Sequence, residues 1–479
     1  MKEYKVLLIS PGLSREKQAG GLKDIANVLP TLGVGYIAAR LERENFTVRI
    51  LDCIGRPMSE AEIIESIRDF GPNLIGITAT ILNINVACQL GRILKRNFPK
   101  AILAVGGPQF SSNPVETLEK DIFDFGAVGE GEITFLEAAN ALRRGDFSPG
   151  KVKGLAYKSG GKIIQNEPRP YISDLDTLPH PAMHLYPALS TYKPVPASYK
   201  AKPVGLMITS RGCPYRCIFC DRTVFGNRFR AHSPKYVVDE MELLINKFGA
   251  KEIRFMDDTF TMDPKRTQAI CEEILKRGIK VPWTCLTRVD RVSLDMLKTM
   301  KRAGCWQVIY GLESGDNGML ERMKKGVTVE DNEKAVKLAK AAGLNVRATF
   351  VFGMPGESAR SIKKTVNFAK KAKLDVVNFF TVVLYPGNEL FKIAKKEGKV
   401  LHSDYEQYTS LIDPEKTHLH YVPEGMSEKE LKNAIVQAYR DYYFRPEFVI
   451  RQALGVRGVE DINRYWQAFK SLVSLRKSS

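Results

Sequence analysis

One stretch of the sequence decides the fold: Arg211-Gly-Cys-Pro-Tyr-Arg-Cys-Ile-Phe-Cys220. It holds Cys213, Cys217 and Cys220 in a Cys-x3-Cys-x2-Cys array that follows a predicted strand. A structural zinc site needs four ligands, and the nearest further donor is His232, with no second Cys-x2-Cys pair after it. Three closely spaced thiolates instead suit a 4Fe–4S cluster whose fourth iron has no protein ligand. We therefore expect these three cysteines to bind such a cluster.

Around and beyond this array, strands alternate with helical segments from residue 201 to 400. Six strands are expected: Gly205–Thr209, Glu252–Met256, Trp283–Thr287, Gln307–Gly311, Val346–Phe352 and Val376–Val383. Six strands with intervening helices favour a partial (β/α)6 barrel over a second open sheet. Active sites of such barrels lie at the carboxyl ends of the strands.

The array also resembles the Cys-x3-Cys-x-aromatic-Cys signature of radical S-adenosylmethionine (SAM) enzymes, with Phe219 in the aromatic place. The resemblance implies that the open iron binds SAM and that reduction of the cluster cleaves SAM to a 5′-deoxyadenosyl radical. It extends to motifs at later strand ends, which imply SAM contacts by Asp257, Asp258, Arg288, Glu313, Ser314, Phe352 and Gly353.

Each implied SAM contact has a simpler structural interpretation. Asp257 and Asp258 would suit the SAM amino group, but acidic residues after a strand commonly cap a helix. Arg288 would suit the SAM carboxylate or pair with Asp290. Glu313 would suit the ribose hydroxyls or remain a surface charge. Their order, each at a predicted strand end, favours the SAM site.

Residues 1–143 have the alternating pattern of a doubly wound, Rossmann-like α/β domain. The expected strands are Val6–Ile9, Phe46–Leu51, Leu74–Thr78, Ile102–Val105 and Phe125–Val128, and the expected helices are Leu32–Asn45, Ser59–Phe70, Ala87–Asn97 and Pro114–Glu119. Sheets of this type bind ligands beyond the carboxyl ends of their strands.

Such a domain ahead of a radical SAM core resembles the cobalamin-binding radical SAM family over essentially the whole chain. The similar segments are Leu29–Ala38, Ile77–Thr80, Val105–Gly107 and Val128–Glu132. They imply cobalamin contacts by Leu32, Gly33, Tyr36, Thr78, Thr80, Gly106, Gly107, Gly129 and Glu130. Alternatively, the glycines merely permit tight turns.

One departure concerns the axial ligand of cobalt. Many cobalamin domains carry Asp-x-His-x-x-Gly, and we expect the corresponding segment here to be Leu51–Pro57, with Ile54 at the histidine position. No histidine precedes His180. We expect cobalamin, if bound, to lack a histidine ligand from this domain.

The remaining segments connect or cover the two α/β units. Residues 144–200 are rich in turn formers and predict a hairpin and an extended linker. Residues 401–479 are predicted to be mainly helical, with Trp466, Phe469 and Leu472 on one face. Residues 438–450 resemble a segment of family members that act on tetrapyrroles and membrane lipids, including the anaerobic magnesium-protoporphyrin ester cyclase. Their aromatic spacing equally fits a helix packed against the barrel.

The net charge of +18 is concentrated in one segment. Lysine and arginine minus aspartate and glutamate give −1 for 1–143, +4 for 144–200, +15 for 201–400 and 0 for 401–479. The excess indicates either lysine-rich outer helix faces or an acidic partner, namely a phosphorylated substrate, an anionic membrane surface or nucleic acid.

The leading functional hypothesis is cobalamin-dependent methylation of an unactivated carbon on a lipid-like or anionic substrate, with hydrogen abstraction by the deoxyadenosyl radical. The alternative is radical cyclisation, carbon–carbon coupling or oxidation of a tetrapyrrole or lipid, with cobalamin in a non-methylating role or absent. A third hypothesis, a corrinoid- or nucleic-acid-binding protein with a redox-sensing cluster, lacks support because no small basic RNA-binding domain is recognised.

The sequence also bears on partners and location. The resemblance implies an electron donor such as flavodoxin or ferredoxin, and we do not expect a nucleic-acid partner. The amino-terminal residues show no signal-peptide pattern, and no window approaches a membrane span. We therefore expect a cytoplasmic enzyme, with peripheral contact at the inner membrane face as an option.

Overall fold

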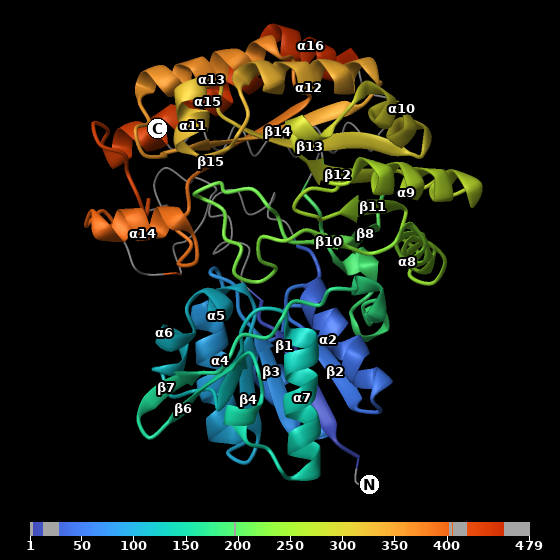
Figure 1. Cartoon of the computed structure of the whole chain (residues 1–479), viewed down its shortest axis with the longest axis vertical. Coiled ribbons are helices and arrows are strands. Elements are labelled where there is room, and N and C mark those ends of the chain that lie inside the picture. The colour runs from blue at the N-terminus through green and yellow to red at the C-terminus, as the bar shows by residue number, and fades with distance from the viewer. Residues whose placement is uncertain (1–2, 13–27, 196–197, 402–404, 406–418, 455–479) are drawn as a thin grey trace.

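The computed structural model describes residues 3–12, 28–195, 198–401, 405 and 419–454. They form two α/β units that face each other, the amino-terminal unit in blue to cyan and the barrel in green to orange (Figure 1). The helices predicted around Trp466, Phe469 and Leu472 lie outside the described residues. No described helix is long and apolar enough to cross a membrane.

The first unit is a seven-stranded sheet in the order β2-β1-β3-β4-β5-β6-β7. Its strands are β1 (Lys5–Ser10), β2 (Thr47–Asp52), β3 (Leu74–Thr78), β4 (Ile102–Gly106), β5 (Phe125–Ala127), β6 (Leu155–Ser159) and β7 (Lys162–Gln165). The first five are parallel. The predicted hairpin forms as β6 and β7, and its pairing with β5 extends this sheet.

Helices cover both faces of this sheet, which confirms the doubly wound fold. On one face α2 (Leu32–Arg43) and α7 (Gly131–Arg144) pack in the core that contains Val6 and Leu8. On the other, α3 (Glu60–Phe70) and α4 (Ile84–Asn97) pack with Leu7 and Ile9. The short helices α5 (Pro108–Ser112) and α6 (Pro114–Leu118) follow β4. Because β1 is buried on both faces, it is a continuous apolar run.

The second unit is the predicted partial barrel of six parallel strands, in the order β15-β14-β13-β12-β11-β8. The strands are β8 (Val204–Met207), β11 (Glu252–Phe255), β12 (Trp283–Thr287), β13 (Cys305–Glu313), β14 (Asn345–Phe352) and β15 (Val376–Thr381). The connecting helices are α8 (Pro234–Asn246), α9 (Pro264–Lys276), α10 (Leu294–Arg302), α11 (Asn317–Arg322), α12 (Val329–Ala341), α13 (Ala359–Lys371) and α14 (Glu389–Lys396). A two-stranded ribbon, β9 (Ser210–Arg211) with β10 (Arg230–Ala231), follows β8.

The linker closes the amino-terminal mouth of this barrel. The backbone N–H groups of Lys200 and Ala201 donate to the carboxylate of Glu252, and the guanidinium of Arg254 donates to Ser198. The indole N–H of Trp306 donates to the other carboxylate oxygen of Glu252, over 3.1 Å. These contacts anchor the linker to the amino-terminal ends of β11 and β13.

Helix α15 (Glu428–Tyr443) covers the open edge of the barrel at β15, and α16 (Pro446–Leu454) follows it (Figure 1). The Tyr439 hydroxyl accepts from the Phe379 N–H and donates to the Phe379 carbonyl, both over 3.1 Å. Tyr443 pairs with both backbone groups of Val377 in the same way. These tyrosines satisfy the unpaired edge of the sheet. The aromatic spacing of residues 438–450 is thus that of a helix packed against the barrel, as one interpretation held.

Candidate functional site

The cysteine loop begins at the end of the short strand β9, on the carboxyl side of the barrel. Gly212 has φ +82°, and a side chain there would meet the Arg228 carbonyl, so only glycine fits this turn. Cys213 is half-buried, Cys217 is buried and Cys220 is exposed. The loop places the three thiols together at the face where barrel enzymes hold their active sites.

Two neighbouring loops fix the backbone of this segment. The Ile218 N–H donates to the Met323 carbonyl over 3.1 Å, and the Leu390 N–H donates to the Ile218 carbonyl over 2.9 Å. The buried Asn388 amide donates to the Phe219 carbonyl over 3.0 Å while its oxygen caps α14. Phe219 therefore contributes to this site through its backbone carbonyl.

The three thiols influence one another electrostatically. Although the Cys220 residue is exposed, the surrounding loops desolvate its thiolate and raise its pKa to about 12, and the charges of Asp258, Cys213 and Cys217 add to this effect. Burial also raises the pKa of Cys213, again with Asp258 contributing. Since cluster ligands are thiolates, cluster binding must displace these protons. No described group of three or more His, Cys, Asp or Glu side chains is arranged around a single metal ion. The mutual proximity of these thiols fits ligands that each bind a different iron of one cluster.

The two adjacent aspartates after β11 have different surroundings. The Asp257 carboxylate is buried and accepts hydrogen bonds from the Thr209 N–H, the Thr209 hydroxyl and the Ser210 N–H. Asp258 is exposed and lies close enough to the cysteines to raise the pKa of two of them. Asp257 therefore anchors β9, and Asp258 is the carboxylate that faces the cysteines.

Arg288 forms an ion pair with Asp290, which was the sequence-based alternative to a SAM contact. Its Nε and Nη2 donate to the Asp290 carboxylate, and Nη2 also donates to the Lys325 carbonyl. Its guanidinium stacks on the Tyr215 ring, 3.4 Å from the centroid. Nη1 makes no hydrogen bond among the described residues. Tyr215 belongs to the cysteine loop, so this stack holds Arg288 beside the cysteines with one nitrogen free to donate.

Glu313 lies at a bulge in β13, where the register with β14 shifts. Its φ is +61°, a conformation that costs a non-glycine residue roughly 1–3 kcal/mol and is concentrated at functional sites. Its carboxylate pairs with Lys325 over 2.8 Å, and both side chains are buried. The alternative of a surface charge is excluded.

The other predicted SAM residues act through packing or backbone. The buried Ser314 hydroxyl lies 3.1 Å from that of Thr365 and accepts from the Asp316 N–H. The Phe352 ring is buried and stacks on Phe379. Gly353 has φ +85°. These residues shape the carboxyl ends of β13 and β14.

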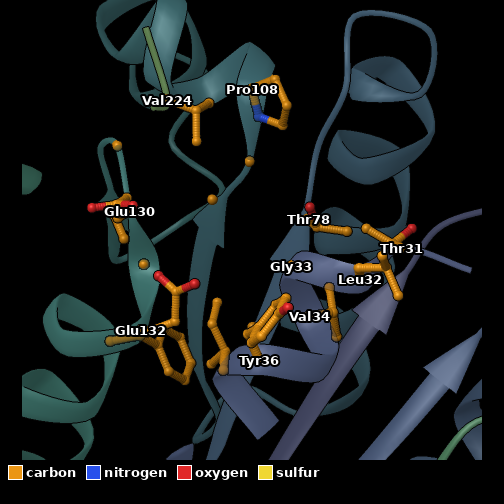
Figure 2. A pocket seen from close by; sticks show the side chains of 18 of the residues that line it. Thr31, Leu32, Gly33, Val34, Tyr36, Thr78, Pro108, Glu130, Glu132 and Val224 are labelled. Carbon is orange, nitrogen blue, oxygen red and sulfur yellow. The ribbon is translucent and has the colours of Figure 1, made fainter. Parts of the chain in front are cut away.

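A cavity of about 330 Å³ lies at the carboxyl edge of the first sheet. All the predicted cobalamin residues line it except Thr80, namely Leu32, Gly33, Tyr36, Thr78, Gly106, Gly107, Gly129 and Glu130. Figure 2 shows Thr31, Leu32 and Thr78 across the cavity from Glu130, with Val224 and Pro108 at one end. The Thr80 hydroxyl instead contacts Asn83 over 3.1 Å.

The glycines of this cavity leave room for a ligand to approach the backbone. A side-chain carbon at Gly33 would meet nothing within 4 Å, and one at Gly129 only the Val224 carbonyl at 3.8 Å. Gly107 has φ +96°, so the turn after β4 requires glycine. The cavity thus fits a large ligand bound chiefly through backbone and apolar contacts.

Ile54 does not line this cavity. It lines a second cavity of about 400 Å³ together with Gly12, Cys53, Gly55 and Leu90. Residues 51–57, which the sequence aligned with the axial-histidine motif, therefore lie away from the first cavity, because β2 is the edge strand of the sheet and its loop opens elsewhere. The residues that line the first cavity nevertheless include no histidine.

A buried ion-pair network, which the sequence did not reveal, joins the two units. Arg211 donates to Glu130 over 2.9 Å and to Glu132 over 2.6 Å, and Arg230 donates to Glu130 over 2.9 Å. The exposed fraction of the Arg211 side chain is 2%. The Tyr36 hydroxyl donates to the Ile208 carbonyl, 3.3 Å away. Every carboxylate of the cavity wall is therefore paired within the protein.

One continuous segment serves both sites. After Cys220, Asp221 accepts from the Ser112 hydroxyl at the end of α5 and from the Thr223 N–H. Val224 and Phe225 then form one wall of the cavity. The cysteine loop and the cavity are consequently neighbours along the chain and in space.

Comparisons with known proteins agree with this geometry. Residues 207–369 match the radical SAM superfamily and residues 20–139 match the B12 binding domain. An uncharacterised methyltransferase of Pyrococcus horikoshii is 34% identical over 96% of each chain. The anaerobic magnesium-protoporphyrin IX monomethyl ester cyclase of Rubrivivax gelatinosus is 28% identical over 93% of this chain and 78% of its own. Cytidylyl-2-hydroxyethylphosphonate methyltransferase of Streptomyces wedmorensis is 29% identical over 83% of this chain and 82% of its own.

The fold is shared with a solved structure of the cobalamin-dependent SAM radical enzyme OxsB, determined with aqua-cobalamin and SAM bound. The TM-score is 0.76 at 19% identity, over 99% of this chain and 72% of that one. With the matched domains and the full-length relative, these findings identify the family. The chain belongs to the radical SAM superfamily, among the members that carry a B12-binding domain ahead of the radical SAM domain.

Proposed function

We propose that this enzyme is a cobalamin-dependent radical SAM methyltransferase that methylates an unactivated carbon of an anionic or lipid-like substrate. One observation carries the proposal. The segment from Cys213 to Phe225 bears the three thiols and then forms a wall of the glycine-lined cavity. If the thiols bind the cluster and the cavity binds cobalamin, this single backbone segment would bring the two cofactors together, as transfer of a methyl group to a radical requires.

The family's cofactors are a 4Fe–4S cluster, SAM and cobalamin, and the described residues fit them. When bound, the cluster and SAM supply a 5′-deoxyadenosyl radical, and cobalamin supplies the methyl group. Cys213, Cys217 and Cys220 would hold the cluster. The protein's own task is to bind and orient these groups and to exclude water.

Three side chains are suited to orient SAM beside the cysteines. Asp258 offers an exposed carboxylate to an ammonium group. Arg288, fixed by Asp290 and Tyr215, offers one nitrogen to a carboxylate. Glu313 keeps one carboxylate oxygen for hydroxyl groups while the other accepts from Lys325.

The cobalamin-binding unit, which we assign to residues 1–143, holds its ligand without a protein imidazole. The cavity wall is glycine-rich and apolar, and its charged side chains are committed to one another. We infer that affinity comes from contacts with the corrin periphery and with the backbone at Gly33, Gly107 and Gly129.

Two observations favour an anionic substrate. The barrel segment 201–400 carries a net charge of +15. In addition, one relative is named as a methyltransferase of a cytidylyl phosphonate. The same charge would suit peripheral contact with anionic lipids. The radical chemistry needs a reductant, for which we propose flavodoxin or ferredoxin.

A second candidate is radical cyclisation, coupling or oxidation, which the similarity to the magnesium-protoporphyrin ester cyclase favours. In this case cobalamin would not donate a methyl group. The two candidates share the cluster and SAM, so SAM cleavage alone does not separate them.

The test is anaerobic reconstitution of the full chain with iron, sulfide and cobalamin, followed by reduction with SAM carrying a deuterated methyl group. We expect 5′-deoxyadenosine in solution and deuterium in the protein-bound corrinoid, measured by mass spectrometry. SAM cleavage with retained but unlabelled corrinoid would contradict methyl transfer and support the second candidate. A Cys217→Ala variant is the control for cluster-independent cleavage.

A further inference from the structure

The inner face of the barrel carries charged and polar side chains that the other described residues satisfy only in part. Arg254 of β11 lies beside Thr284 of β12, and Thr284 lies beside Gln307 of β13. In the next row Ile309 lies beside Arg347 of β14. Neighbours in register on parallel strands share a face, so these residues form two adjacent rows.

The opposite face of the same strands identifies which side this is. Phe255, Trp283, Cys285 and Val308 alternate with those residues and pack in the apolar core beneath the outer helices. Successive side chains of a strand point to opposite faces. Arg254, Thr284, Gln307 and Arg347 therefore line the interior of the barrel.

Several of these inner polar atoms are buried without a partner. The exposed fractions are 6% for Arg254, 0% for Thr284 and 1% for Gln307. Among the described residues, Arg254 Nε, Thr284 Oγ1 and both side-chain amide atoms of Gln307 lack any hydrogen bond. Buried polar atoms are nearly always paired, because leaving one unpaired costs about 1–3 kcal/mol. A cluster of four unpaired atoms on one face indicates a ligand.

The charges on this face indicate whether that ligand is a cation or an anion. Neither Arg254 nor Arg347 has a carboxylate within ion-pair distance among the described residues, and Arg347 donates only to Asn378, over 3.0 Å. Burial, together with the charge of Arg347, lowers the pKa of Arg254 to about 10, and the charge of Glu252 opposes this shift. Glu252 itself is occupied by Trp306 and the linker backbone. Two neighbouring guanidinium groups without a counter-ion require an anion.

Apolar side chains separate this layer from the cysteines. Met256 and Leu286 lie on the inner face, two residues beyond Arg254 and Thr284, and are 40% and 37% exposed. Two residues further along each strand stand Asp258 and Arg288. The interior thus passes from the SAM contacts through a row of Met256, Leu286 and Ile309, which is apolar except for Arg347, to a polar floor that contains Arg254 and is closed by Ser198–Ala201.

We propose that Arg254 and Arg347, with Gln307, bind an oxyanion of the substrate, a phosphate, phosphonate or carboxylate, at the floor of the barrel. The apolar layer then holds the reacting carbon near the cysteine loop. This inference rests on the proposed function, because it names the part of the substrate that the barrel holds.

The test measures anion binding directly, on the reconstituted full chain with saturating SAM, by isothermal titration calorimetry. The probes are inorganic phosphate, methylphosphonate and acetate, whose ranking distinguishes the phosphorus oxyanions from a carboxylate. Arg347→Gln and Arg254→Gln should each weaken the best probe about tenfold to a hundredfold, the effect of one charge-assisted hydrogen bond. Lys363→Gln, an exposed charge in the same basic segment, should change nothing. Equal binding by wild type and both arginine variants, or no binding by any, would overturn the inference.

A Gln307→Met variant guards against misfolding as the cause of lost affinity. Removal of a buried unpaired amide should raise the free energy of unfolding without anion, while phosphate binding weakens about tenfold. A variant that is both less stable and weaker in binding would indicate a packing role and contradict the proposal. Deuterium transfer to the corrinoid tests the proposed function separately, since it needs neither arginine nor an anion.

Discussion

Charged side chains line both the cavity of the first unit, where we propose that cobalamin binds, and the interior of the barrel, but the two regions treat these charges differently. At the cavity, Arg211 and Arg230 are paired with Glu130 and Glu132, all within the protein. In the barrel, Arg254 and Arg347 have no counter-ion among the described residues, and Asp258 stands exposed beside the cysteines.

This difference distinguishes charges that hold the two units together from charges that are available to bind a ligand. Paired charges at the cavity wall dock one unit on the other and leave glycine and apolar surface to meet the ligand. Unpaired charges in the barrel are available to ligands. A buried charge is costly without a partner, so where the protein supplies none, the ligand is expected to supply it.

The largest expected effect comes from removing a cluster ligand. Cys217→Ala should abolish reductive SAM cleavage, measured as 5′-deoxyadenosine, and lower the iron content of the reconstituted protein. Cobalamin retention should persist, because residue 217 does not line the cavity. Cys271→Ala, at a buried position in α9, should retain cleavage. Loss of cobalamin together with the cluster would break the comparison, since the two sites would then depend on each other.

The next effect concerns the paired charges. Arg211→Met leaves Glu132 without its partner and should lower the free energy of unfolding by about 3–5 kcal/mol, as for other broken buried pairs. Denaturant unfolding of the ligand-free protein measures it. Lys337→Ala, which breaks an exposed pair with Glu333 on α12, should cost no more than about 0.5 kcal/mol. Similar small losses for both variants would show that the buried network is not structural.

A buried carboxylate without a basic partner provides a test through pH. Burial raises the pKa of Glu357 to about 7 from 4.5, against hydrogen bonds from Ser361 and Ser358. The native state therefore binds more protons than the unfolded state between pH 4.5 and about 7, and its stability falls as the pH rises through this range. The total fall is about 3–4 kcal/mol.

Glu357→Gln should remove this fall, so the variant gains stability relative to wild type as the pH rises. Unfolding curves at several pH values measure the difference. If the free energies of unfolding of the two proteins changed with pH in parallel, Glu357 would have a cation partner or be hydrated.

The smallest effect separates stability from binding at the cavity. Gly33→Ala should raise the free energy of unfolding by up to about 1 kcal/mol, because alanine favours the helix and meets nothing within 4 Å. The same methyl group should weaken cobalamin retention. Gly278→Ala also meets open space but at φ +66°, so it should lower stability and leave cobalamin untouched. Unchanged cobalamin affinity in Gly33→Ala would show that the ligand does not approach α2.

Much of the fold followed from local pattern. All the predicted strands form, because each is a short apolar run between turn formers, and the barrel and the doubly wound sheet follow from their spacing. The cysteine loop was equally clear. Three thiols at that spacing have few other uses.

The errors and omissions concern contacts between distant residues. Asp257 and Asp258 looked alike in sequence, yet strand alternation places the first with the outward Phe255 and the second with the inward Arg254. The alternation of side chains along the strand could therefore have distinguished the roles of the two aspartates from the sequence alone. The position of Ile54 away from the first cavity could not be predicted, because the order of strands in the sheet decides which loop meets that cavity. The pairs of Arg211 with Glu130 and Glu132 join residues about eighty positions apart, and only docking of the two units creates them.

The central claim is that one segment, Cys213 to Phe225, places the cluster and cobalamin side by side. Electron paramagnetic resonance of the reduced, cobalamin-loaded enzyme tests it most directly, because two paramagnets held close together broaden and split each other's signals. We predict such spin coupling between the reduced cluster and cob(II)alamin. Signals identical to those of the cluster alone and of cob(II)alamin alone would contradict the account.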